Sequence, residues 1–188
     1  MRRALKALVL SGVVALLWAP AQARAEGYVS PFAGVVFGND SIDSKPTYGV
    51  NAGWMGAGII GGEVDFGFAP DVFTDVVDNH LLDVMGNIII GIPVGGTSGP
   101  GVRPYVTGGV GLIQVKIDPG VTSVGEYKTN DFGFNLGAGV MGYFSDHVGL
   151  RGDIRYFRTV DDTDTGNGFD FDLGGFDFWR ASIGLVIR

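Results

Sequence analysis

Polar and hydrophobic residues alternate along most of the chain after residue 26. In VGLRGDIRYFR, residues 148–158, Leu150 and Ile154 share one face, while Arg151 and Arg155 share the other. A period of two residues is that of a β-strand with one apolar face. No window after residue 26 shows a convincing helical repeat over three turns. The alternation predicts eight strands, at 28–37, 47–54, 59–69, 80–92, 102–113, 131–143, 148–158 and 177–187.

The connections between the predicted strands alternate between long and short. The short ones are 55–58 and 144–147, and 93–101 is intermediate in length and rich in glycine. The long ones are acidic, at 38–46, 70–79, 114–130 and 160–176. Antiparallel strands with tight turns at one end and long polar loops at the other are typical of bacterial outer-membrane barrels. We therefore predict an all-β fold, an eight-stranded antiparallel up-and-down transmembrane β-barrel.

The charged residues of the predicted strands lie on one face, and Lys is absent from these strands. An Arg on the lipid face near the bilayer midplane would cost roughly 2–4 kcal/mol, whereas inside a barrel opposite charges can pair. The interior of eight strands is just wide enough for side chains to fill. We expect a balanced interior charge network that plugs the lumen, helped by Asn51, Asn87 and Asn135. Its members are Glu63, Asp65, Asp83, Arg103, Arg151, Asp153, Arg155 and Arg180.

Aromatic residues gather near the predicted strand ends. Girdles of aromatic side chains flank the apolar band of membrane barrels. High strand propensity of aromatic residues is the alternative explanation. The candidates for interfacial positions are Trp54, Phe68, Phe144, Tyr156 and Trp179.

The N-terminus has the features of an export signal. Arg2, Arg3 and Lys6 precede an apolar run from Ala7 to Trp18, and small residues surround Arg24. This run is too short for a membrane-spanning helix, which needs about 20 residues. We expect a cleavable signal peptide at 1–25 and a barrel domain at 26–188, with a retained anchor as the alternative. No Cys follows the cleavage site, so a lipoprotein is excluded.

Composition excludes several classes of function. The chain has no Cys, which rules out disulfides and thiolate chemistry. Its formal net charge is −7, and the predicted signal takes away only basic residues, so nucleic-acid binding through phosphate contacts is not expected. Glycine is unusually frequent, at 33 of 188 residues, against about 7% in average proteins.

Two glycine motifs match the dinucleotide fingerprint, GAGIIG at 56–61 and GAGVMG at 137–142. That fingerprint requires a helix after the glycine turn, and neither motif precedes one. The spacing Gly-x-Gly is also a strand period. We expect it to place glycines on one barrel face, where they leave room for bulky interior groups or allow curvature. No cofactor is expected.

The chain resembles the small eight-stranded outer-membrane barrels of the OmpA transmembrane-domain, OmpX and OmpW type over residues 26–188. The resemblance lies in the signal, the eight alternating segments and the last strand, FWRASIGLVIR. It implies a monomer in the outer membrane of a Gram-negative bacterium, in contact with outer-membrane lipids and lipopolysaccharide and inserted by the barrel-assembly machinery. Proteins of this type usually end on an aromatic residue, whereas this chain ends on Arg188, which puts that assembly signal in question.

Three classes of function follow. The first is a structural or surface-interaction barrel whose acidic extracellular loops meet a partner. The second is a narrow OmpW-like channel for small or hydrophobic solutes, with Leu81, Phe157 and Phe178 lining an apolar interior. The third is a lipid-modifying enzyme, but His80 has no Ser at matching spacing and His147 falls in a periplasmic turn. We expect no enzyme.

The connection at 161–172, DDTDTGNGFDFD, partly matches a calcium-binding loop. Gly166 and Leu173 stand where that motif needs ligands. We therefore expect an acidic solvated loop and no metal site. Bridging of these carboxylates to phosphorylated surface lipids by divalent ions stays open.

Overall fold

The computed structural model describes residues 25–38, 44–70, 79–117, 127–160 and 176–188, which form eight strands and their short connections. The predicted signal up to residue 24 and most of each long connection, including the candidate calcium loop, lie outside the described residues. No helix in the described part of the chain is long and apolar enough to cross a bilayer. The strands are β1 Ala25–Gly38, β2 Lys45–Gly56, β3 Ile60–Pro70, β4 Asn79–Gly91, β5 Gly101–Ile117, β6 Tyr127–Tyr143, β7 Val148–Thr159 and β8 Asp177–Ile187.

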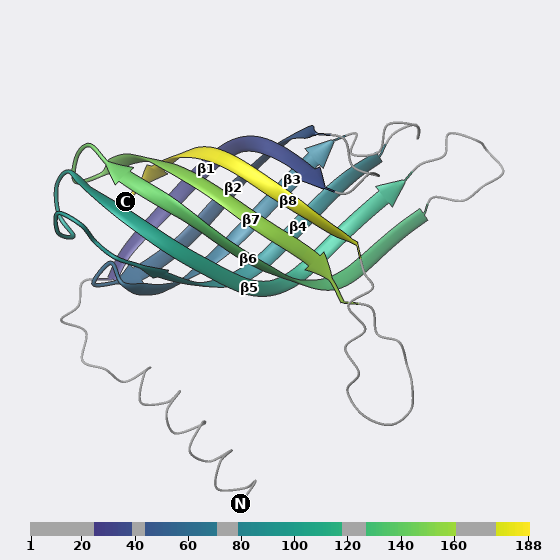
Figure 1. Cartoon of the computed structure of the whole chain (residues 1–188), viewed down its shortest axis with the longest axis horizontal. Coiled ribbons are helices and arrows are strands. Elements are labelled where there is room, and N and C mark those ends of the chain that lie inside the picture. The colour runs from purple at the N-terminus through teal and green to yellow at the C-terminus, as the bar shows by residue number, and fades with distance from the viewer. Residues whose placement is uncertain (1–24, 39–43, 71–78, 118–126, 161–175) are drawn as a thin grey trace, which may run out of the picture.

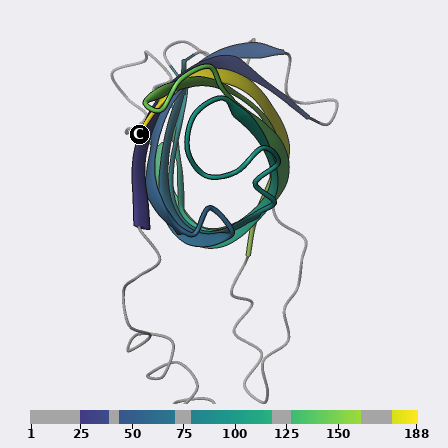
Figure 2. The same cartoon turned by 90° about the vertical axis from the view of Figure 1, so that its left-hand side faces the viewer.

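The eight strands form one closed antiparallel barrel, in which each strand pairs with its neighbours in sequence and β8 pairs with β1 (Figures 1 and 2). The closing seam includes the pairs Phe32 with Gly184 and Phe37 with Trp179. Closure leaves none of the eight described strands with an unpaired edge. A membrane-spanning sheet must be closed in this way, because the bilayer core offers no water to hydrogen-bond an open edge. The predicted fold class is confirmed.

Five of the eight strands, β1, β2, β5, β6 and β7, are longer than the alternation predicted, mostly at the end that carries the long connections. β5 and β6 continue to the pairs Lys116 with Lys128 and Ile117 with Tyr127. The absence of Lys therefore holds only for the shorter predicted ranges, since the observed strands also include Lys45. The hydrophobic alternation ends before the strands do, because backbone pairing continues where the sequence is no longer apolar.

The two glycine motifs differ in structure. In GAGVMG, Gly137 and Gly139 lie on the inner face, where an added Cβ would stand 2.6 Å from Arg155 Cγ and 2.4 Å from Tyr105 Oη. In GAGIIG, Ala57 and Gly58 form the β2–β3 turn with φ values of 49° and 67°. The expectation of glycines on one face holds for the first motif only. In the second, left-handed backbone is needed for the tight turn.

The fold predicts heat-modifiable migration on a gel. A closed barrel resists detergent at room temperature, so unboiled refolded protein should run ahead of the boiled form. Semi-native electrophoresis with membrane fractionation checks this. An unchanged position on boiling, together with protein found soluble in the periplasm, would contradict a membrane barrel.

Candidate functional site in the barrel lumen

The barrel interior is arranged in layers along the barrel axis. The layer toward the long connections, here the outer apolar layer, contains Val36, Ala69, Leu81, Met85, Ile113, Phe157 and Phe178. The layer toward the short turns, here the inner layer, contains Tyr28, Met55, Ile89, Tyr105, Met141, Tyr143 and Val186. Four carboxylates and three guanidinium groups, here the central charge network, lie between the two layers, except that Asp83 is flanked on β4 by Leu81 and Met85 of the outer layer. The members of the network are Glu63, Asp65, Asp83, Asp153, Arg151, Arg155 and Arg180.

Arg155 of β7 is the centre of the central charge network. Its guanidinium group lies 2.7 Å from Glu63, 2.8 Å from Asp65 and 2.8 Å from Asp153, measured between nitrogen and carboxylate oxygen. Glu63 and Asp65 belong to β3, which is four positions away from β7 in the ring of eight strands. Arg155 therefore joins opposite walls of the barrel.

Arg151 makes a second bridge between β7 and β3. Its Nη1 lies 2.5 Å from Glu63 Oε2, and its Nε donates to Tyr105 Oη at 2.7 Å. The hydroxyls of Tyr28 and Tyr105 donate to Glu63 and Asp153 at 2.5 and 2.6 Å. These two tyrosines link the charges to the inner layer. Tyr105 shares its strand face with Arg103 and Thr107, so the alternation predicts that it points inward. The inward position of Tyr28 could not be predicted in this way, because the alternation in the first strand is irregular.

Arg180 of β8 bridges to the strand opposite it, β4. Its Nη1 lies 3.0 Å from Asp83 Oδ1, and its Nη2 lies 2.5 Å from Asp65 Oδ2. Asn51 also donates to Asp65, at 2.6 Å, and Asn135 donates to Asn87 at 2.7 Å. Because Asp65 accepts from three residues, it connects the two bridges into one network.

Arg103 does not join the central charge network. It sits at the short-turn end, where its Nη2 lies 3.0 Å from Glu26 Oε2. Arg188 lies 3.3 Å from the same oxygen, and its guanidinium carbon is 3.9 Å from the centre of the Tyr143 ring. The expected balance of four acids and four arginines is therefore corrected: three arginines face four acids at the centre, and Arg103 pairs with Glu26, which the strand pattern did not include.

The short-turn end of the lumen is covered in part by the β4–β5 connection, residues 92–100, which curves across the opening in Figure 2. Gly99 N donates to Asp146 Oδ1 at 2.6 Å, and Arg188 donates to the Gly99 carbonyl at 3.2 Å. These contacts tie the connection to the β6–β7 turn and to the last strand.

The side chains of the central charge network are buried, so loss of one partner would lower the stability of the barrel. Arg155 and Asp65 are 0% exposed, as is the side chain of Glu63. Removing one partner of a buried ion pair typically costs about 3–5 kcal/mol, because the other charge stays desolvated. Arg suits this position since its planar fork donates to several carboxylates at once.

The predicted interfacial aromatics point outward and fall at both ends of the wall. Trp54 and Phe144 lie near the short turns, with exposed fractions of 55% and 64%. Phe68, Tyr156 and Trp179 lie near the long connections, where the Tyr156 and Trp179 rings are 5.2 Å apart. Their placement at the two interfaces of a bilayer stays a prediction.

The two histidines lie apart from the lumen chemistry. The ring of His80 packs 5.6 Å from that of Phe68 at the long-connection end. His147 is exposed in the β6–β7 turn, where its carbonyl accepts from Arg188 N at 2.9 Å. Within the described residues, no group of three His, Cys, Asp or Glu could hold a metal ion.

The lumen geometry predicts that Gly67→Ala destabilises the barrel. A Cβ at Gly67 would stand 2.3 Å from Arg180 Nη1 and 2.6 Å from both oxygens of Asp83. Overpacking of this kind costs about 1–3 kcal/mol. The urea unfolding free energy in lipid vesicles should fall by that amount. Gly152→Ala is the matched control, since a Cβ there meets nothing within 4 Å. Equal effects of the two variants would contradict the described packing.

Comparison with known proteins places this lumen in a known fold. The family model described as "Outer membrane protein beta-barrel domain" matches residues 7–176. None of the curated proteins searched matches the chain. Among solved structures, Neisserial surface protein A (NspA) is 16% identical with a TM-score of 0.63, over 87% of this chain and 98% of that one.

Two further structures are similar. The N-terminal barrel domain of Pseudomonas aeruginosa OprF is 16% identical with a TM-score of 0.57, over 87% of this chain and 98% of that one. Ail of Yersinia pestis was crystallised with the heparin analogue sucrose octasulfate. It is 14% identical with a TM-score of 0.52, over 86% of this chain and 98% of that one. Such low identities show a shared fold alone. The family match covers most of the sequence, and the chain belongs to the outer-membrane protein β-barrel domain family, as a small eight-stranded barrel of a bacterial outer membrane.

Proposed function

We propose that the protein is a closed outer-membrane barrel with a structural or surface-interaction role, in which the central charge network plugs the lumen. One observation carries this proposal: Arg155 reaches from β7 to Glu63 and Asp65 on the opposite strand, at 2.7 and 2.8 Å. A side chain that spans the lumen and pairs on the far side leaves little room for a solute.

Two more bridges between opposite strands support the plug. Arg180 joins β8 to Asp83 of β4, and Arg103 joins β5 to Glu26 of β1. An ion or solute passing through would have to displace pairs at more than one level. Each displaced charge would lose its partner while it stays buried away from water, which is unfavourable in free energy.

The long connections suit a role at the cell surface. In barrels of this kind the long loops are extracellular, and residues 39–43, 71–78, 118–126 and 161–175 contain acids but no Lys or Arg. The polyanionic analogue bound to Ail therefore does not indicate the partner of this chain, because acidic loops would repel a polyanion. We expect a cationic partner, or divalent ions that bridge the loop carboxylates to phosphate groups of lipopolysaccharide.

The remaining features of the proposal follow from the class of protein. We infer a cleaved signal at 1–25, insertion by the barrel-assembly machinery, contact with outer-membrane lipids and lipopolysaccharide, and a monomer. We also propose that the chain is not an enzyme, since His80 packs on Phe68 and His147 lies in a turn at the other end.

The outer apolar layer favours one second candidate, a narrow channel for hydrophobic solutes. Leu81, Phe157 and Phe178 lie in this layer, and the Phe157 and Phe178 rings stack with centres 4.8 Å apart. A solute from the long-connection side would meet apolar side chains first. The central charge network lies directly behind them, which is why we place this candidate second.

Conductance across planar bilayers tests the plug. The refolded wild-type protein should show no stable openings. Arg155→Ala should produce small discrete openings, because it removes the side chain that spans the lumen. Ile183→Ala, a lipid-facing residue that is 62% exposed, is the control and should stay closed. Stable wild-type openings that change in Arg151→Ala or Glu63→Ala would overturn the plug and favour the channel.

A further inference from the structure

The outer wall of the barrel is hollowed where glycines replace side chains on the lipid-facing side. Successive partners in the strand register around the wall alternate between large residues and glycine. The row runs through Trp54, Gly62, Ile88, Gly108 and Leu136, from β2 to β6. The glycines carry no side chain, and those of Trp54 and Leu136 lean over Gly62 and Gly108, where an added Cβ would stand 3.5 Å from Trp54 Nε1 and 2.9 Å from Leu136 Cδ2.

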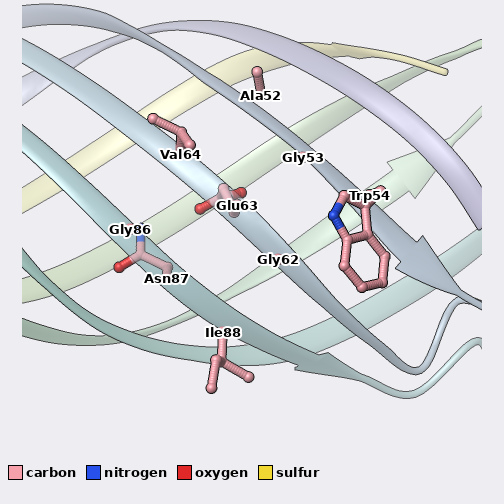
Figure 3. A pocket seen from close by; sticks show the side chains of 9 residues that line it. All are labelled: Ala52, Gly53, Trp54, Gly62, Glu63, Val64, Gly86, Asn87 and Ile88. Atoms are coloured by element: carbon pink, nitrogen blue, oxygen red, sulfur yellow. The ribbon is translucent and has the colours of Figure 1, made fainter. Parts of the chain in front are cut away.

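Two grooves result, and Ile88 lines both. The first has a volume of about 410 Å³ and lies over β2, β3 and β4 (Figure 3). The second has a volume of about 430 Å³ and lies over β4, β5 and β6. Ile88, which is 62% exposed, forms the ridge between them. The first groove is lined on its lipid side by Ala52, Trp54, Gly62, Val64, Gly86 and Ile88, the second by Ile88, Ile90, Val106, Gly108 and Leu136.

The indole of Trp54 lies at the short-turn end of the first groove. A Cβ at Gly62 would stand 3.5 Å from Trp54 Nε1, so the ring lies beside the backbone of Gly62. Gly86 and Ala52 lie farther from the turn, toward the middle of the wall. The groove therefore runs from the level of an interfacial tryptophan into the apolar band, as the acyl chain of a lipid does.

The lining contains no charged group on the lipid side. Glu63 contributes only backbone, since its side chain is 0% exposed and pairs with Arg151 and Arg155 inside the barrel. An ionic ligand would find no partner in either groove, whereas a hydrocarbon chain would fill them.

We propose that the paired grooves bind one two-chain phospholipid of the periplasmic leaflet, which straddles Ile88 with one acyl chain in each groove. Short turns face the periplasm in barrels of this kind, which sets the leaflet. The grooves are continuous with the lipid-contacting band, so a lipid is the molecule that reaches them first. The proposal rests on the membrane location and is independent of the plug in the lumen.

Lipid retention tests this site. The full-length chain is refolded into vesicles of phosphatidylethanolamine and phosphatidylglycerol, extracted into mild detergent and analysed by native mass spectrometry. The wild-type barrel should retain one diacyl phospholipid, with the two headgroups in proportion to the vesicle composition. Lysophospholipid, which fills one groove, should compete poorly.

Gly86→Leu should abolish retention, because it fills the first groove. A Cβ at Gly86 would be 3.8 Å from its nearest neighbour, the Val110 carbonyl oxygen, so the backbone accepts the change. Gly152→Leu is the matched control: Gly152 is also exposed, has open space around it and borders neither groove. Ala52→Leu, which fills the same groove without replacing a glycine, repeats the test if Gly86→Leu does not fold.

Three results would overturn the proposal. The first is equal loss of lipid in Gly86→Leu and Gly152→Leu. The second is selection of one headgroup, which would mean recognition by charge. The third is a dimer that Gly86→Leu dissociates, which would make a second copy of the chain the occupant. Heat-modifiable migration of each variant confirms that it is folded.

Discussion

Arginine–carboxylate pairs that cross the lumen are the interactions on which the rest of this barrel depends. A small barrel must fill its interior with side chains, and here the middle of that interior is ionic rather than apolar. Arg151 and Arg155 reach from β7 to β3, and Arg180 reaches from β8 to β4. Since these strands face each other across the ring, every bridge fixes the separation of two opposite walls. The outer apolar layer lies on the long-connection side of these pairs and the inner layer on the short-turn side.

The requirements of this interior extend into the sequence of the wall. Inward glycines stand where a large side chain comes close. Gly67 lies beside Arg180, which reaches across the lumen from β8, and Gly139 lies beside Tyr105 of the neighbouring strand β5. Glycines that face outward are not explained by close packing in the lumen, since no lumen side chain covers them. There the alternation of glycine with Trp54, Ile88 and Leu136 shapes a surface that lipid must fill. One residue type thus makes room for lumen side chains on one face and shapes the outward-facing wall on the other.

Much of the fold could be predicted from alternation alone, because a period of two residues assigns each side chain to lumen or lipid. Arg151, Asp153 and Arg155 fall on one face of one strand, and that face is inward. The ends of the strands were harder to predict, since backbone pairing continues through Lys116 and Lys128 after the hydrophobic alternation stops. Alternation also gives no height along the barrel axis. It therefore grouped Arg103 with the other charges, although Arg103 lies at the short-turn end with Glu26.

A double-mutant cycle on Asp83 and Arg180 tests most directly whether lumen pairs hold the barrel together. Arg180→Met leaves the buried Asp83 without its cation and should lower the unfolding free energy by about 3–5 kcal/mol. Asp83→Leu should cost less, because Arg180 keeps its pair with Asp65. The double variant should lose less than the sum of the two, by about 0.5–3 kcal/mol, because neither charge is then left alone. Urea unfolding in lipid vesicles measures all four proteins. Losses that add within about 0.5 kcal/mol would contradict a coupled ion pair across the lumen.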